Sequence, residues 1–149
     1  GKAGEAEIAQ AEAEDATATG ALAAAQARAA VPTAEAKRQA WEQTVAGTVS
    51  NAMQRQVLTG FQRTHDASLL APYADEYFAR IEQIWNSRSH EMAEPAAILG
   101  FPSSQVSEET VNRATALVER VRETNAGLAR TVAECRDDMV RALNARQAS

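Results

Sequence analysis

Apolar side chains recur at three- and four-residue steps along most of this sequence. That spacing places them on one face of an α-helix, whose period is 3.6 residues. No stretch alternates apolar and polar residues for long enough to indicate a β-strand. The pattern therefore predicts an all-α protein of about eight helices, most of them short and joined by brief turns.

The first two predicted helices, Glu5–Glu14 and Ala18–Ala30, consist largely of alanine. Alanine favours a helix because it loses no side-chain entropy there. Helices of this length are marginally stable alone in water, so they need neighbours to pack against. We expect residues 1–31 to form a helix pair that packs on further helices, including ones from a preceding part of a longer chain. Its few large apolar anchors are Ile8, Leu22 and Val31.

Capping residues mark the ends of several later helices. Thr33, directly after Pro32, is placed to cap a helix that runs to about Val45 and stops at Gly47. In the same way Ser50 begins the next helix, for which Gly60 is the predicted C-terminal glycine, and Ser107 begins the seventh. The eighth and last helix is predicted from about Ala126 to Arg146.

The segment from Ser68 to Trp85 carries the largest apolar side chains, and we expect it to be the core helix, with Pro72 in its first turn. The following helix, from Ser87 or Ser89 to Leu99, contains Pro95, which predicts a bend or a split. The side chains expected to anchor the fold are Trp41, Leu70, Tyr73, Tyr77, Phe78, Ile81, Trp85, Leu117 and Leu143.

Short antiparallel helices in series fit either a helix bundle or an α-solenoid of the HEAT or armadillo kind. The paired helix lengths favour the second, so we predict a fragment of a HEAT/armadillo-like superhelix in which residues 1–149 form one domain. The chain also begins with Gly1 rather than Met, which suggests a piece of a larger protein.

Charge and hydropathy argue against two classes of partner. The formal net charge is −5, and no basic stripe of the kind that binds phosphate backbones is visible, so no nucleic-acid partner is expected. No apolar run is long enough to cross a membrane, and the acidic start lacks a signal-peptide pattern. Together with a single cysteine, Cys135, these features predict a cytoplasmic protein.

The sharpest chemical signal is His90-Glu91-Met92-Ala93-Glu94. Zinc peptidases use His-Glu-x-x-His because two histidines four residues apart share a helix face and grip one metal. Here Glu94 replaces the second histidine and Pro95 follows it. Arg113 stands at the position where such zinc peptidases carry a glutamate as the third metal ligand. We therefore predict a solvated helix face. The alternative, a metal site at His90 and Glu94, would be tested by measuring bound metal in a His90→Ala variant.

The remaining chemical candidates are weak. His65-Asp66 lies between Gly60 and Pro72, where a loop with Asp66 or Ser68 as a helix cap is expected. Cys135 is expected to be a small buried side chain on a helix rather than a nucleophile. The aromatic residues of the core helix could stack a ligand, but at helical spacing they indicate core packing. We therefore predict no catalytic residue, no metal ligand and no cofactor in this chain, and assign no substrate-binding residue.

Several phrases, in this order, resemble the C-terminal helical domain of bacterial aminopeptidase N, especially in high-GC bacteria. They are Pro32-Thr33-Ala34-Glu35-Ala36-Lys37 with Ala40-Trp41, then Leu70-Ala71-Pro72-Tyr73 through Tyr77-Phe78 to Ile84-Trp85, and Ala129-Arg130 through Glu134-Cys135-Arg136-Asp137 to Arg141-Ala142-Leu143-Asn144-Ala145-Arg146. Glycine is common in that family where Cys135 stands, and arginine where Asn144 stands. The resemblance covers about residues 5–146.

The resemblance implies a zinc-dependent parent enzyme that removes N-terminal residues from peptides, with its catalytic zinc in an upstream domain of the same chain. The C-terminal domain of such enzymes is a HEAT-like bowl that walls the chamber over the active site and admits peptides. On this hypothesis the present chain is a non-catalytic cap whose partners are the upstream catalytic domain and the peptide substrates. The alternative is a stand-alone α-helical scaffold for protein interaction.

Overall fold

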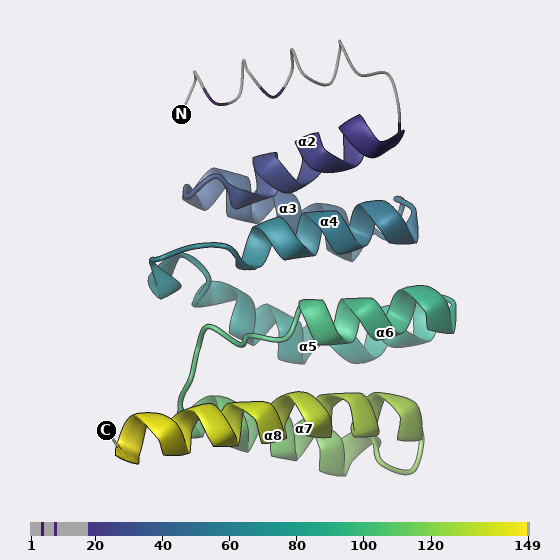
Figure 1. Cartoon of the computed structure of the whole chain (residues 1–149). Helices are drawn as coiled ribbons and strands as arrows, with labels where there is room; N and C mark the ends of the chain where they lie inside the picture. Colours follow the sequence, from purple (N-terminus) through teal and green to yellow (C-terminus); the bar gives the residue numbers. More distant parts are fainter. Residues whose placement is uncertain (1–3, 5–7, 9–17, 149) are drawn as a thin grey trace. The chain divides into compact units, whose positions relative to one another are not determined.

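The structure is a computed structural model that describes Gly4, Ile8 and residues 18–148. Residues 18–148 form seven α-helices and one 3-10 turn, with no strand among them, so the all-α prediction is confirmed (Figure 1). The predicted helix Glu5–Glu14 lies outside the described residues, apart from Ile8. The elements are α2 (Ala18–Ala30), α3 (Ala34–Ala46), α4 (Asn51–Gln62), η1 (Ala67–Leu69), α5 (Pro72–Ser87), α6 (His90–Leu99), α7 (Glu108–Val121) and α8 (Ala126–Ala148).

The chain divides into two compact units, Gly1–Leu69 and Leu70–Ser149. In the first unit α2 packs on α4, and both contact α3. In the second unit α5 pairs with α6 and α7 with α8, while α8 also contacts α6 and α5 contacts α7. In the part of the chain that the structure describes, every helix is too short or too polar to cross a lipid bilayer.

The predicted N-caps Thr33, Ser50 and Ser107 and the predicted C-terminal Gly47 are confirmed. The hydroxyl of Thr33 accepts a hydrogen bond from the backbone N–H of Ala36 at 3.1 Å, and Ser50 and Ser107 accept equivalent bonds at the starts of α4 and α7. Gly47 ends α3 with a φ of 67°, in the left-handed region that glycine enters without steric cost. These helix ends are set by local side chains, which explains why the sequence predicts them.

Gly60 does not end α4, contrary to the prediction, because the helix continues through it to Gln62. Gly60 is buried against α2, and a Cβ atom built there would overlap the carbonyl of Gln26 and lie 2.9 Å from the Cβ of Ala29. The missing side chain therefore lets the backbones of α2 and α4 approach closely. The alanine-rich α2 therefore packs on α4 within this unit.

The core helix of the second unit starts at Pro72 rather than at Ser68. Proline occupies the first helical position, where its missing N–H costs least. The residues before it form the short turn η1, and the carboxylate of Asp66 accepts a 3.0 Å hydrogen bond from the N–H of Ser68. Asp66 is therefore the cap that the sequence offered as one of two choices.

Three aromatic rings form the centre of the second unit. Tyr77 packs edge-on against Phe78 and Phe101, with ring centroids 5.3 and 5.6 Å apart. The buried hydroxyl of Tyr77 donates a 2.7 Å hydrogen bond to the carbonyl of Ala97, which fixes α5 to α6. The guanidinium of Arg113, on α7, lies 4.9 Å from the centroid of the Phe78 ring and also pairs with Asp75 of α5.

Pro95 does not split α6, which runs as one helix from His90 to Leu99. The proline removes one helical hydrogen bond. Its cost is offset by close packing, because Pro95 itself is buried with three alanines of the same helix, Ala93, Ala96 and Ala97.

Candidate functional site

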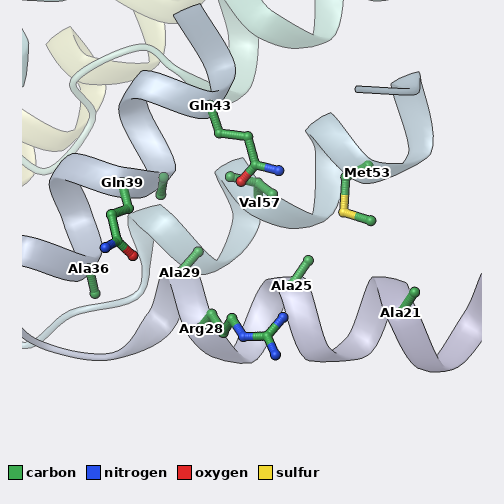
Figure 2. A pocket seen from close by; sticks show the side chains of 10 residues that line it. Ala21, Ala25, Arg28, Ala29, Ala36, Gln39, Gln43, Met53 and Val57 are labelled. Atoms are coloured by element: carbon green, nitrogen blue, oxygen red, sulfur yellow. The ribbon is translucent and has the colours of Figure 1, made fainter. Parts of the chain in front are cut away.

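A groove opens between α2, α3 and α4 of the first unit, with a cavity volume of about 260 Å³. We call it the α2–α4 groove, and Figure 2 shows the side chains that line it. They come from α2, α3 and α4 and are Ala21, Ala25, Arg28, Ala29, Ala36, Gln39, Ala40, Gln43, Met53 and Val57.

The lining of the α2–α4 groove combines two kinds of surface. Alanine methyl groups with Met53 and Val57 give it an apolar floor, while Arg28 extends from α2 and Gln39 and Gln43 extend from α3 (Figure 2). A glutamine amide both donates and accepts hydrogen bonds, as a peptide backbone does, and a guanidinium binds carboxylates. The groove therefore has the chemistry to hold an extended peptide segment.

Lys37, in the first turn of α3, links the helices that form this groove. Its side chain is fully buried, and its Nζ donates to the carbonyl oxygens of Ala29 at 2.8 Å, Arg63 at 2.9 Å and Gly60 at 3.2 Å. The carbonyls at the C-terminal end of a helix have no partner within the helix and carry partial negative charge. One ammonium group thus joins the C-terminal ends of α2 and α4 to the start of α3.

The protonation of Lys37 matters because only an ammonium has three N–H donors for three carbonyls. Burial lowers the pKa of Lys37 from 10.5 to about 8, so the group stays protonated at neutral pH. The local sequence pattern does not indicate this role, because lysine is usually exposed. A signal was present, because Lys37 and Lys2 are the only lysines in a chain that otherwise uses arginine. An ammonium directs its three donors tetrahedrally, whereas the N–H donors of a guanidinium all lie in one plane.

His90 and Glu94 do meet on one face of α6, with His90 Nε2 3.0 Å from Glu94 Oε2. Their side chains are 69% and 46% exposed, and His90 lies edge-on to Trp85. Nowhere in the described residues do three metal-binding side chains gather. Two exposed ligands fall short of the three protein ligands that a catalytic zinc requires. The residues present therefore do not fit the zinc site of a peptidase.

Cys135 lies half-buried on α8. Burial, together with the smaller effects of the nearby Asp138 and Glu134 carboxylates, raises the pKa of the thiol to about 11. Because the thiolate is the nucleophilic form, this environment lowers the reactivity of Cys135 at neutral pH. His65 is exposed in the loop before η1, where its neighbour Asp66 acts as a turn cap.

The residues named as structural anchors lie in both units. Trp41 is buried in the first, packed against Phe61 with ring centroids 5.9 Å apart. In the second unit Trp85 and Leu143 are half-buried. The other anchors of that unit are buried, and they are Leu70, Tyr73, Tyr77, Phe78, Ile81 and Leu117.

Comparison with known proteins places these features in a family. The profile described as "ERAP1-like C-terminal domain" matches residues 1–141. The chain belongs to this family. Aminopeptidase N of Streptomyces lividans is 44% identical to it over 149 residues, which is 99% of this chain and 17% of that relative. The resemblance predicted from the sequence is confirmed, and the chain spans about one sixth of the length of the relative it matches.

In this ERAP1-like C-terminal domain, the segment from Pro32 to Lys37 connects three helices. Pro32 follows the end of α2, Thr33 caps α3, and Lys37 bonds the ends of α2 and α4 from the first turn of α3. This segment is therefore a compact helix junction. Its residues support the α2–α4 groove.

Proposed function

We propose that this chain is the non-catalytic C-terminal domain of a longer zinc-dependent aminopeptidase of the aminopeptidase N type, which removes N-terminal residues from peptides. The observation that carries the proposal is the 44% identity over nearly the whole chain to a relative about six times as long. In this proposal the catalytic zinc is held outside these residues, by an upstream domain of the same polypeptide, in the cytoplasm.

The domain's task in that enzyme is to wall the chamber over the active site and to limit access to peptides. The α2–α4 groove supports this part of the proposal, because its lining suits a peptide segment. Its apolar floor accepts aliphatic side chains, and Gln39 and Gln43 offer donors and acceptors to a peptide backbone. Arg28 adds a cation for a carboxylate on the peptide.

The experiment that tests the proposal is to read the open reading frame upstream of Gly1. We expect a continuous frame of several hundred codons that encodes a His-Glu-x-x-His helix and a distal ligand glutamate. A stop codon followed by a start codon close to Gly1 would contradict the proposal. It would favour the alternative, a stand-alone helical scaffold that binds a partner protein in the same groove.

A further inference from the structure

Ile98, in the last turn of α6, is 44% exposed. Among the residues that the structure describes, it is the large apolar side chain that is exposed to solvent. Isolated exposed apolar residues are common, but one beside an apolar pocket extends that pocket into a larger apolar surface, and such surfaces mark interaction sites. Ile98 has such a pocket beside it.

The Ile98 pocket has a cavity volume of about 220 Å³ and lies wholly within the second unit. Phe101 and Met139, both buried, lie at its base, and Val106, Cys135 and Ala142 complete its apolar lining. Asp138 and Ser103 contribute the polar atoms, and the carboxylate of Asp138 pairs with Arg141. A pocket with this lining selects an uncharged apolar group, because its one carboxylate already has a cationic partner.

The α8 side of the pocket leads to a surface with little cover of its own. α8 has 23 residues and its antiparallel neighbour α7 has 14, so α8 is nine residues longer. From Arg141 to Ala148 every residue is exposed except Leu143, which is half-buried. The pocket includes Ala142 in this segment.

We infer that the Ile98 pocket receives an apolar side chain from the part of the longer polypeptide that lies outside these 149 residues. This inference rests on the proposed function. The chain covers 17% of its Streptomyces relative, so five sixths of such a polypeptide is available to supply the occupant. A single aliphatic or aromatic side chain seated in a pocket is the usual anchor of an interface between protein surfaces.

The direct test is a photo-crosslink in the purified full-length polypeptide. Ser103 is exposed and lines the pocket, so a benzophenone amino acid at that position lies beside the occupant. We expect the crosslinked peptides to come from the same polypeptide, outside residues 1–149. Crosslinks only to residues within 1–149, or to a second copy of the chain, would overturn the inference.

A second measurement uses Cys135 as an internal reporter. After maleimide treatment of the full-length protein, mass spectrometry of the tryptic peptide Thr131–Arg136 gives the labelling rate of Cys135 alone. We expect Ile98→Asp to raise this rate on the order of tenfold, because a carboxylate would expel an apolar occupant and uncover the thiol. Ile98→Leu should leave the rate unchanged.

The matched control is Ala116→Asp, which places the same carboxylate on an exposed position of α7 in the same unit. It should label like the wild type. Equal labelling of the Ile98→Asp and wild-type proteins would contradict the inference. Zinc-dependent aminopeptidase activity is measured on the same samples. An active enzyme in which Cys135 labels equally fast in the wild type and in Ile98→Asp refutes only this inference. The absence of any longer polypeptide refutes the proposed function and removes the occupant with it.

Discussion

Lys37 on α3 and Gly60 on α4 meet through a hydrogen bond, in which the Lys37 Nζ donates to the Gly60 carbonyl oxygen at 3.2 Å. Gly60 also gives α2 the space to approach α4. One residue of α4 thus serves two requirements, a close backbone contact and an acceptor for a buried cation. The α2–α4 groove depends on both.

Replacing Lys37 with methionine should destabilise the protein by roughly 1–3 kcal/mol, because buried carbonyl oxygens lose their donor. Two of the three, on Ala29 and Arg63, lie at or just beyond helix ends. Urea unfolding followed by circular dichroism measures the effect. Arg55→Met, the same replacement at an exposed position of α4, is the control and should change stability little. Equal stability of the two variants would contradict the role assigned to Lys37.

The contribution of Lys37 should also depend on pH. Its pKa in the folded protein is about 8, below its ordinary value of 10.5, so between these values the unfolded chain binds more protons than the folded one. Stability therefore rises with pH in that window, as the cost of burying the charge is relieved. The difference in unfolding free energy between the wild type and Lys37→Met should increase from pH 7.5 to pH 10. A difference that decreases would mean that the three carbonyls outweigh burial and hold the pKa up.

Gly60→Ala should lower the unfolding free energy by roughly 1–3 kcal/mol, although alanine is the better helix former. The added methyl group would press on Ala29 and on the Gln26 carbonyl, which forces α2 away from α4. Thermal or urea unfolding checks the prediction. Gly4→Ala is the control, since a Cβ atom there meets nothing within 4 Å. A Gly60→Ala protein as stable as the wild type would show that the helices separate without cost.

Filling the α2–α4 groove should affect long substrates selectively if it contacts peptide. In the full-length enzyme, Ala25→Trp is expected to lower kcat/KM for long peptides several-fold and to leave cleavage of aminoacyl-arylamides unchanged, since only the long peptides reach the groove. Ala23→Trp places the same side chain on an exposed position of α2 outside the groove and should have no effect. Equal loss for both substrate classes would argue against peptide contact here.

The sequence predicts features that depend on neighbouring residues and misses those that depend on contacts between distant ones. Thr33, Ser50 and Ser107 cap their helices through bonds that span three residues, so the local pattern reveals them. Gly60 looks like a helix end, because its reason for being glycine is a helix more than thirty residues earlier. Lys37 is missed for the same reason, since its carbonyl partners come from the ends of two other helices.

At Pro95 the local sequence predicts a feature that the packed structure does not show. The local rule predicts a bend or a split, but α6 runs as one helix through Pro95, which is buried beside alanines of the same helix. The site could be predicted only in part. The resemblance indicated the family, while the α2–α4 groove appears only once three helices have been brought together.

The most direct test of the proposed function is a parallel assay of zinc content and aminoacyl-arylamide cleavage by the 149-residue chain and by the full-length polypeptide that contains it. We predict stoichiometric zinc and chelator-sensitive cleavage for the full-length protein, and neither for the chain alone. Zinc-dependent cleavage by the 149-residue chain would contradict the account.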